Sequence, residues 1–595
     1  MTTSNEGVAR YLDLDGTAAY AVLHETAPMR RATAVLLLAP FGWDDTSSYR
    51  ARRTWAVSLA DDGYPVLRLD LPGTGDSGGG PSDPDRVPAW IAAITAAVHE
   101  LRAATGCPRV ALVGLGLGGL LGLAATDAGA SVDELVLWAA PGRGRAIVRE
   151  LKAFAQMEAS RAPDAGPLPD GAFAANGYLL TADTVAALTA LDAASMAAPG
   201  VERALLLGRD GLPVDDKVRS SLETSGVKVT VADGPGYGAL TSTHQQSRLP
   251  RTTMGTVAAW LAEGGTPIDA DPAPPPPEHR APRTTTTISV GGDEIRERLV
   301  TFDQRDVRLV GVLAEPTAEP APLCAVLLNA GAQRRIGPNR MWVEAARRWA
   351  TRGVPTLRVD LASIGDSGGR DRFPIADREL YEGEYGEQVS GILDHLVGLG
   401  LPERFLLMGL CSGAYWSFRT GQVDERVAGV VLLNPLALVF DPFQPTIRQT
   451  QKLRRLSQPA MWGRLLRGDV AGGNIREVAR ATVMRGVTSP QRLVGRIVDN
   501  RRAARAGGNE LDYALDRLRD NGVRARLVFT ASEPLRRELA HDGFFERLDR
   551  WPNLLLHLLD GPPDTHTLQP LAVQREIHEV IDMAVDALLV GRIEP

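Results

Sequence analysis

One motif that occurs twice limits the possible folds of this chain more than any other feature. Residues 66–80 read VLRLDLPGTGDSGGG, and residues 356–370, about 290 positions later, read TLRVDLASIGDSGGR. This spacing is far too long for a solenoid repeat. A chain of 595 residues also exceeds what one hydrophobic core usually organises. The sequence therefore predicts two domains of the same fold.

A proline-rich stretch separates the two copies. It reads GGTPIDADPAPPPPEHRAPRTTTT over residues 264–287, has no apolar period and favours extended polyproline geometry. We therefore predict one domain at 1–263, a linker at 264–287 and a second domain at 288–595. We expect the two domains to contact each other; the alternative is an independent first domain on the linker.

Apolar segments alternate with helical patterns in the same order in both halves. Each half opens with a buried-strand signal, AVLLLAPFG at 34–42 and CAVLLNAGA at 324–332, and continues through a helical segment into the repeated motif. A later strand of each half ends in a glycine-rich turn, at 109–119 and 404–414. This alternation indicates the α/β class, with a mostly parallel, doubly wound sheet in each half. A dinucleotide-binding fold is disfavoured, because its glycine-rich turn follows the first strand.

The glycine-rich turn of the second half has the spacing of a nucleophile elbow. It reads GLCSG over residues 409–413, and in such an elbow a sharp strand-to-helix turn lifts the central side chain above the sheet. The thiol of Cys411 would then lie at a helix N-terminus, where the helix dipole favours the thiolate. The alternative is a small buried cysteine without a chemical role. The context of the turn favours Cys411 as a nucleophile.

Two further residues complete a catalytic triad in the chain order nucleophile, acid, base. His566 lies on the loop after the last predicted strand, 553–559, which is the place of the base in this arrangement. Glu533 follows the preceding predicted strand, where an acid orients the imidazole and stabilises imidazolium. Other candidates in the second half fit less well, namely the histidines His541, His557 and His578 and the acids Asp542 and Asp564.

Backbone groups and arginines near the elbow supply further expected contacts. We expect an oxyanion site formed by the backbone N–H groups of Ser412 and Ala332, the second of which lies in the loop after the first main strand. That loop, 329–340, carries three arginines that would bind substrate, unless it is merely a solvated loop: Arg334, Arg335 and Arg340.

A long insertion, about 446–505, interrupts the second half and is dense in arginine. It contains fourteen Lys and Arg against three acidic residues. We predict that it forms a helical cap over the active site. Its basic side chains, Arg454 and Arg455 among them, would hold phosphate groups such as those of CoA or a phosphopantetheine arm. The alternative is an ordinary solvated face.

The first half lacks the residues that would make it catalytic. Its elbow has Gly116 in place of the nucleophile, and Ala239 aligns with His566. Asp210 remains near the position of the acid without an expected partner, and His244 lies five residues beyond the expected place of the base. We predict a copy of the fold without catalytic activity.

The motifs of both halves resemble a known family. The second half is similar to the type 1 group of α/β hydrolases associated with exosortase A gene clusters, through RRIGPNR at 334–340, GLCSGA at 409–414 and DTHT at 564–567. The first half is similar to the type 2 group of the same clusters, through the elbow GLGLGG at 114–119 and GYLLT at 177–181. Both halves also carry the repeated motif.

The resemblance implies two tandem α/β-hydrolase domains, of which the second carries the catalytic residues. It supports Cys411 as nucleophile and His566 as base. It also supports Glu533 at a position where the family more usually has Asp. A cysteine in an elbow is likewise similar to dienelactone hydrolases, whose reaction is also acyl transfer.

A cysteine nucleophile favours acyl transfer from a thioester, because the acyl-enzyme is itself a thioester. The expected substrate is a thioester of CoA or of an acyl carrier protein, or an ester. The acyl group passes either to water or to an amine or hydroxyl, depending on how well the cap excludes water. The competing hypothesis is a non-catalytic scaffold or binding protein built from two hydrolase folds.

Composition disfavours several other classes of protein. The net charge of −7 gives no general electrostatic reason to bind nucleic acid, and no apolar run reaches the ~18 residues that suggest a membrane span. The three cysteines, Cys107, Cys324 and Cys411, are too scattered for a disulfide framework or a thiolate metal site, so we expect no metal and no cofactor. The N-terminal segment lacks the pattern of a secretory signal, and we expect a cytoplasmic protein.

Overall fold

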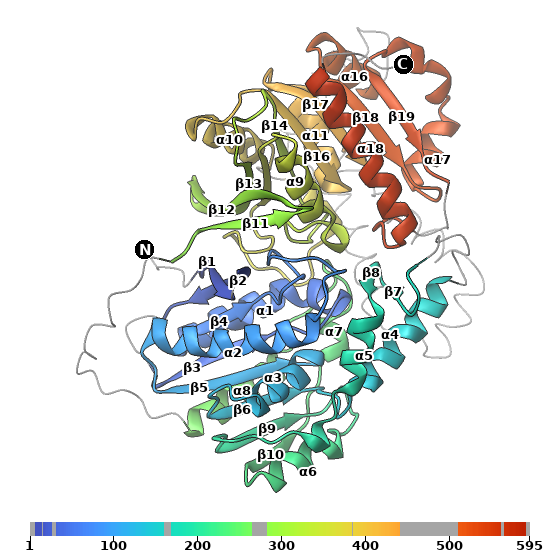
Figure 1. Cartoon of the computed structure of the whole chain (residues 1–595). Helices are drawn as coiled ribbons and strands as arrows, with labels where there is room; N and C mark the ends of the chain where they lie inside the picture. Colours follow the sequence, from blue (N-terminus) through green and yellow to red (C-terminus); the bar gives the residue numbers. More distant parts are fainter. Residues whose placement is uncertain are drawn as a thin grey trace, which may run out of the picture.

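The computed structural model has two sheet-bearing halves stacked one above the other (Figure 1). The first half, blue to green in Figure 1, lies below the second, which runs from yellow-green to red. Both sheets are mostly parallel, which confirms the α/β class. The structure describes residues 6–14, 16–26, 31–159, 168–264, 282–382, 385–440, 510–560 and 565–590.

The first half is built on an eight-stranded sheet in the order β1-β2-β4-β3-β5-β6-β9-β10. β1 pairs with β2, and β2 with β4, in antiparallel fashion, and the remaining pairs are parallel. The strands are β1 (Val8–Leu14), β2 (Thr17–His24), β3 (Thr33–Leu38), β4 (Val66–Leu69), β5 (Arg109–Leu115), β6 (Glu134–Trp138), β9 (Arg203–Leu207) and β10 (Lys228–Ala232). A separate hairpin consists of β7 (Phe173–Ala175) and β8 (Tyr178–Leu180).

Alternate residues of the central strands enter two different cores, one on each face of this sheet. Leu36 and Leu112 belong to one core, whereas Val35 and Val113 belong to the other. Because both faces are buried, these strands are apolar throughout, as parallel sheets require. The helices of this half are α1 (Trp43–Asp61), α2 (Arg86–Thr105), α3 (Leu117–Asp127), α4 (Gly144–Ala159), α5 (Ala182–Ala190), η1 (Ala193–Ser195), α6 (Asp216–Thr224), α7 (Tyr237–Leu240) and α8 (Arg251–Gly264).

The second half repeats this strand order and adds one strand at the edge, giving β11-β12-β13-β15-β14-β16-β17-β18-β19. The pairs from β11 to β15 are antiparallel and those from β15 to β19 are parallel. The strands are β11 (Thr285–Val290), β12 (Asp293–Gln304), β13 (Val307–Pro316), β14 (Cys324–Leu327), β15 (Thr356–Asp360), β16 (Phe405–Leu410), β17 (Val427–Leu433), β18 (Arg524–Phe529) and β19 (Leu554–Leu558).

The helices of the second half cover this sheet as well. They are η2 (Pro338–Arg340), α9 (Met341–Thr351), η3 (Asp377–Leu380), α10 (Tyr385–Gly398), α11 (Ser412–Gly421), α16 (Glu510–Asp520), α17 (Pro534–His541), η5 (Phe545–Arg550) and α18 (Leu571–Val590). The predicted cap at about 446–505 lies outside the described residues. Among the helices that the structure describes, none combines the length and the apolar character that a membrane span needs.

The second domain begins earlier than the sequence predicts. β11 (Thr285–Val290) starts inside the segment predicted as linker and pairs with β12. Just before it, the carbonyl of Arg283 accepts a hydrogen bond of 2.8 Å from the backbone N–H of Tyr11 in β1. The predicted end of the linker at 287 is therefore wrong, because threonines that read as polar linker form an edge strand beside the first half.

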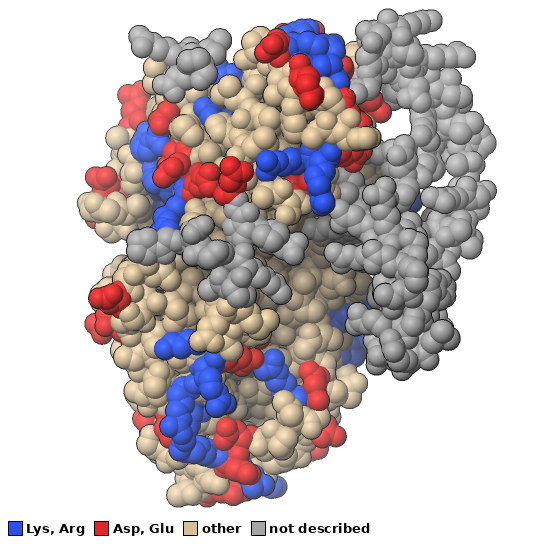
Figure 2. Space-filling view, turned by 90° about the vertical axis from the view of Figure 1, so that its right-hand side faces the viewer, with Lys and Arg blue, Asp and Glu red and all other residues tan. Residues whose placement is uncertain are grey.

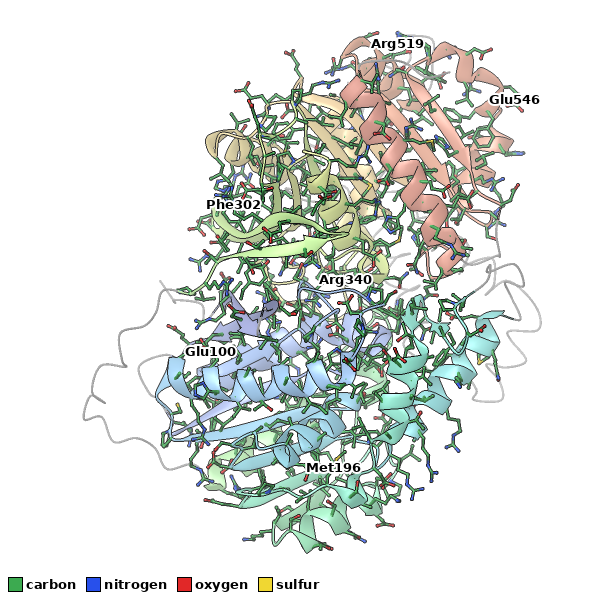
Figure 3. The ribbon with its side chains drawn as sticks, viewed as in Figure 1. Glu100, Met196, Phe302, Arg340, Arg519 and Glu546 are labelled. Carbon is green, nitrogen blue, oxygen red and sulfur yellow. The ribbon has the colours of Figure 1, made fainter. Side chains whose placement is uncertain are left out.

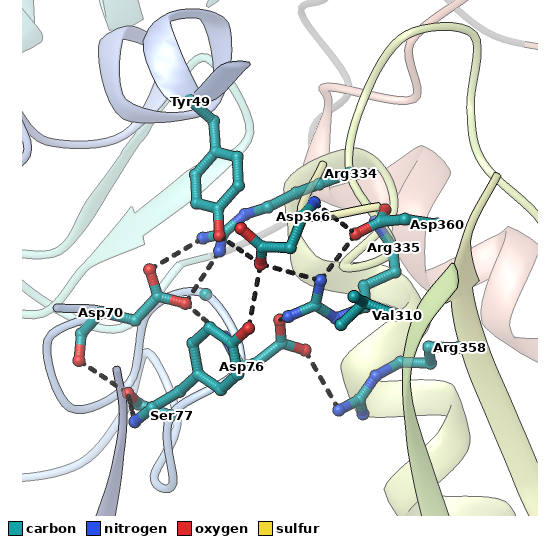
Figure 4. Close-up of polar contacts among 12 residues, drawn as sticks. Tyr49, Asp70, Asp76, Ser77, Val310, Arg334, Arg335, Arg358, Asp360 and Asp366 are labelled. Atoms are coloured by element: carbon teal, nitrogen blue, oxygen red, sulfur yellow. Dashed lines mark hydrogen bonds and ion pairs between the residues drawn. The ribbon is translucent and has the colours of Figure 1, made fainter. Parts of the chain in front are cut away.

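The repeated motif lies at the contact between the two halves. Asp76 of the first half pairs with Arg335 and Arg358 at 2.9 and 3.2 Å (Figure 4). Asp366 of the second half pairs with Arg68 at 2.6 Å. Asp76 and Asp366, like Arg68 and Arg358, are 290 positions apart. The exchange of the same pair in both directions is the mark of a two-fold relation between the halves.

The motif also has the same local structure in both halves. The hydroxyl of Ser77 donates to the carbonyl oxygen of Asp70, and the hydroxyl of Ser367 to that of Asp360, each at 2.6 Å. The motif thus shapes a tight turn that presents a carboxylate to the opposite half. Its repetition explains why the halves pack as a pseudo-dimer within one chain.

Candidate active site

Cys411 lies in a strained turn between β16 and α11. Its backbone has φ 61° and ψ −114°, a conformation that residues other than glycine rarely adopt. The flanking glycines are required by close contacts, because a Cβ at Gly409 would meet the backbone of Gly413 and a Cβ at Gly413 would meet the carbonyl oxygen of Asn329. The turn therefore has the geometry of a nucleophile elbow.

The predicted base and acid are in contact. Nδ1 of His566 lies 2.9 and 3.0 Å from the two carboxylate oxygens of Glu533. Burial lowers the pKa of His566, but interactions with Cys411 and Glu533 outweigh it and raise the pKa to about 9. The imidazole therefore binds the carboxylate, and Cys411 contributes to its raised pKa.

A polar network that the sequence did not indicate holds the base loop. The side-chain amide of Asn434 donates to the carbonyl oxygen of His566 at 3.2 Å, and its oxygen accepts from the backbone N–H of Thr530 at 2.9 Å. The hydroxyl of Thr530 donates to Glu533 at 3.3 Å. Asn434 directly follows β17, and a polar residue at the carboxyl end of a central strand is the only signal that marks it.

Tyr381 is a further residue of the site that sequence reasoning missed. Its hydroxyl lies 3.5 Å from Sγ of Cys411. Its ring lies 5.2 Å from both Tyr415 and Phe440, measured between centroids. The Tyr381 hydroxyl therefore contacts the thiol, and the Tyr381 ring packs in an aromatic cluster. No motif surrounds Tyr381, which follows the short helix η3.

The expected oxyanion donors lie on the two segments that meet at the elbow. Ser412 is the first residue of α11, and Ala332 is buried in the loop after β14. The same loop touches the elbow through Asn329 and Gly413. Whether these N–H groups act on a substrate oxygen stays a prediction.

The arginines of the 329–340 loop do not form an open substrate surface, and this prediction is wrong. Arg334 is fully buried and forms a two-point ion pair with Asp70 of the first half at 2.8 and 3.1 Å. Arg335 is fully buried as well and pairs with Asp76 and Asp360. The alternative of a solvated loop fails for the same reason, since packing of the two halves removes the loop from water.

Arg340, the third arginine, donates to backbone carbonyls of the first half. Its Nε and Nη2 reach the carbonyl oxygens of Gly75 and Ser77 at 2.9 and 2.6 Å. It is therefore an interface residue, although it also lines a cavity. The two cap arginines that the sequence predicts as phosphate ligands, Arg454 and Arg455, lie outside the described residues.

The other candidate histidines have different surroundings. His541 is exposed at the end of α17, followed by the exposed Asp542. His557, in β19, lies 3.0 Å from Arg526, and His578, in α18, pairs with Glu344 at 3.4 Å. Asp564, the other alternative acid, lies outside the described residues.

The first half keeps the elbow geometry without the nucleophile. Gly116 has φ 52° and ψ −121°, close to the values of Cys411. A Cβ at Gly116 would lie 2.6 Å from the hydroxyl of Tyr237. Tyr237 is buried and fills the space above the elbow, so this half has neither a nucleophile nor room for one.

Asp210 has a structural role in the first half. Its carboxylate accepts hydrogen bonds from the backbone N–H groups of Gly236 and Gly238, the second at 2.7 Å. The expectation that Asp210 has no partner is therefore wrong, because the turn that would carry a base folds back onto it. Among the described residues, no group of three or more His, Cys, Asp or Glu side chains could hold a metal ion.

A family model described as "Serine aminopeptidase, S33" matches residues 35–182. The match lies within the first half and includes the elbow in which Gly116 replaces a nucleophile. A search of curated proteins finds no match to this chain.

Solved structures similar to this chain each correspond to about half of it. Est1E from Butyrivibrio proteoclasticus is 17% identical, with 43% of this chain and 98% of that chain covered and a TM-score of 0.31. Proline iminopeptidase from Mycobacterium smegmatis is 16% identical, with 48% and 98% covered and a TM-score of 0.30. Mouse alpha/beta hydrolase domain-containing protein 10 is 16% identical, with 43% and 97% covered and a TM-score of 0.28.

The fold follows from the chain itself and from the family match. Both halves have the same strand order, with an elbow between the central strand and the following helix. The family model matches the first of them. This chain is an α/β-hydrolase-fold protein with two sheet-bearing domains.

Proposed function

We propose that the second half is a cysteine-dependent acyl-transfer enzyme that works through an acyl-Cys411 intermediate. The observation that carries this proposal is the meeting of Cys411, His566 and Glu533 from three separate parts of the chain, with the pKa of the imidazole raised to about 9. An imidazole with this pKa is protonated near neutral pH, which favours a thiolate beside it.

In the first step the thiolate of Cys411 attacks the carbonyl carbon of the acyl donor. A C–S bond forms, and the carbonyl electron pair moves to the oxygen, which the backbone N–H groups of Ser412 and Ala332 stabilise. The electron pair then returns, the bond to the leaving group breaks, and His566 protonates that group. Glu533 holds the imidazole in place and stabilises its charged form.

In the second step an acceptor attacks the acyl-enzyme. His566 removes a proton from water, or from an amine or hydroxyl, and the thiolate of Cys411 leaves. We propose a CoA or carrier-protein thioester as donor, because exchange of one thioester for another has little thermodynamic cost. The arginine-rich composition of residues 446–505 supports a phosphate-bearing donor.

The resemblance to the exosortase-associated hydrolases supports the assignment of Cys411 and His566 but names no substrate. All three cysteines are free and buried, which supports the cytoplasm as the compartment.

Intact-mass spectrometry after incubation with a panel of acyl thioesters tests the proposal. We expect the mass of one acyl group on the wild-type protein, none on Cys411→Ala, and much slower acylation of His566→Ala. Cys324→Ala is the matched control and should keep the adduct, because burial raises the pKa of the Cys324 thiol and leaves it unreactive.

The same experiment separates the remaining alternatives. Release of free acid indicates hydrolysis, and appearance of the acyl group on an added amine or alcohol indicates transfer. An adduct on Cys411→Ala, or no adduct and no turnover with any donor, would reject the enzyme and favour a scaffold built from two hydrolase folds.

A further inference from the structure

A cavity of about 190 Å³ lies between the two halves, apart from the catalytic residues. Residues of the first half that line it include Phe41, Arg86 and Tyr178, and residues of the second half include Arg340 and Leu571. Figure 3 labels Arg340, which lies where the two halves meet. A ligand here would contact both halves at once.

Two buried arginines line this cavity without a carboxylate partner. Arg86 and Arg340 are each only 5% exposed, and neither forms an ion pair with a described carboxylate. Burial lowers the pKa of Arg86 to about 10 and that of Arg340 to about 9. A charged group that is buried without an opposite charge carries a desolvation cost. Backbone carbonyls and, for Arg86, the ring of Trp90 at 4.9 Å offset part of this cost, and an anion in the cavity would offset more of it.

Both guanidinium groups have N–H donors that form no hydrogen bond with a described residue. Nε of Arg86 is buried without a hydrogen bond, and only its Nη1 donates, to the carbonyl oxygen of Pro81 at 3.3 Å. Nε and Nη2 of Arg340 donate to backbone carbonyls of the first half, and its Nη1 has no hydrogen bond among the described residues. Each arginine can therefore still donate to a ligand.

The acidic residues of the same cavity are already engaged. Asp45 pairs with Arg52, and Glu344 lies 3.4 Å from His578 and also interacts with Arg340. The lining has three arginines, Arg86, Arg340 and the exposed Arg575, against these two acids, so positive charge is in excess. Its remaining lining is largely apolar or aromatic and includes Phe41, Tyr178, Leu179, Ile336 and Leu571.

The larger groove on the first half does not show this imbalance. It measures about 900 Å³ and contains Arg143 and Lys217, which both pair with Asp192, at 2.8 and 3.2 Å, and Arg209, which pairs with Glu150 at 3.5 Å. Figure 2 likewise shows basic and acidic side chains close together on the lower, N-terminal half. The two other arginines of the groove, Arg145 and Arg149, are exposed to solvent. None of its cations therefore combines burial with the lack of an opposite charge.

We propose that the cavity between the halves binds a small organic anion, with its carboxylate or phosphate group between Arg86 and Arg340 and its apolar part against the aromatic wall. Arginine suits both groups because its planar fork of donors matches their oxygens. The site is independent of the proposed acyl transfer, since neither Cys411 nor His566 lines it.

The site adjoins the segment that holds the base loop. Asn339, which also lines the cavity, donates to the carbonyl oxygen of Leu568 at 3.0 Å, two residues after His566. Asn339 and Arg340 have φ values of 50° and 71°, a strained backbone of the kind found at ligand clamps. An anion bound at Arg340 is thus one residue away from the contact that positions the base loop.

Calorimetric titration of the full-length protein at constant ionic strength tests the proposal, with benzoate, phenyl phosphate and neutral benzamide as probes. We expect saturable binding of one equivalent of benzoate or phenyl phosphate and none of benzamide. The tighter of the two anions identifies the ligand class. Arg86→Gln should raise the dissociation constant about 10- to 100-fold, the range that loss of a charged hydrogen bond implies.

Two further variants complete the experiment. Arg340→Gln should weaken binding in the same way, and Arg149→Gln, an exposed arginine of the large groove, should leave it unchanged. Because Arg340 also bonds the first half, its variant is read only if circular dichroism shows it folded. The comparison of anions with benzamide needs no variant. Absence of binding by both anions, equal binding of benzamide, or unchanged binding in Arg86→Gln would overturn the proposal.

Discussion

The two elbows show how one backbone conformation serves different residues. Cys411 and Gly116 have nearly the same φ and ψ, in a region that is strained for a residue with a Cβ. Glycine adopts it at little cost, whereas a cysteine there stores roughly 1–3 kcal/mol of strain. Backbone strain is thus retained at Cys411, where the turn presents a nucleophile. It is relieved at Gly116, in the half that has no nucleophile.

Restoring a cysteine to the first elbow should not restore chemistry. In Gly116→Cys the new Cβ would lie 2.6 Å from the hydroxyl of Tyr237, and Ala239 supplies no base. We expect the variant to react with iodoacetamide at Cys411 only, as measured by peptide mass spectrometry. Rapid, pH-dependent alkylation of the new thiol would show that the first half retains a hidden base.

The raised pKa of His566 makes a prediction about stability. The pKa of His566 is about 9 in the folded protein and 6.5 for the free imidazole. Between these two pH values the folded state therefore binds more protons than the unfolded state. The free energy of unfolding falls as the pH rises through this window. We expect wild type to lose up to about 3 kcal/mol relative to His566→Gln between pH 6 and pH 9.5, reduced by the amount to which Cys411 gives up its own proton in the folded state. Urea unfolding at both pH values measures this difference. If the free energies of unfolding of wild type and His566→Gln changed equally between the two pH values, the raised pKa of His566 would be contradicted.

At the level of elements, the hairpin of β7 and β8 connects the first half to α18 and to Asn339 of the second. Gly177, between its strands, accepts a hydrogen bond of 3.0 Å from Gln574 in α18. It has φ 83°, and a Cβ there would lie 2.6 Å from the side chain of Asn339. Only glycine fits at this crossing.

Gly177→Ala should therefore cost more than the backbone strain alone. Gly211→Ala is the matched control, because Gly211 has φ 88° with nothing within 4 Å of its Cβ position. We expect the Gly177 variant to lose about 1–3 kcal/mol, beyond the control, from displacement of Asn339 and its bond to Leu568. Equal urea midpoints for the two variants would show that the hairpin is not held against the second half.

The sequence was sufficient for the α/β class, the two sheet-bearing halves and the position of the elbow, because these depend on local patterns and on their order along the chain. It was insufficient for Tyr381 and Asn434, whose roles arise from contacts between segments without a motif. The error at Arg334 and Arg335 has the same origin. A basic loop indicates an anionic partner, but the sequence does not show that the partner is a carboxylate more than 250 positions away.

At the scale of the whole molecule, the repeated motif supplies the charged side chains that join the two halves. The Asp70 and Asp76 carboxylates enter the second half, and Asp366 enters the first. Arg358 also pairs with Glu297 at 3.1 Å, and burial, which would raise the pKa of Glu297, is outweighed by Arg347 and Arg358, so that its pKa falls to about 2. Such a network stabilises only a complete interface, because a buried charge that loses its partner costs several kcal/mol.

The second half should therefore fail on its own. A fragment covering 282–595, which begins before β11, leaves Arg334, Arg335 and Arg358 without their partners Asp70 and Asp76. We expect this fragment to aggregate or to lose most of its Cys411 acylation, as measured by size-exclusion chromatography and intact mass. A second fragment covering 1–264 supplies those carboxylates and should rescue solubility and acylation when the two are co-expressed. If 282–595 is soluble, monodisperse and acylated as fast as the full chain, the first half is dispensable and the interface has no part in the function.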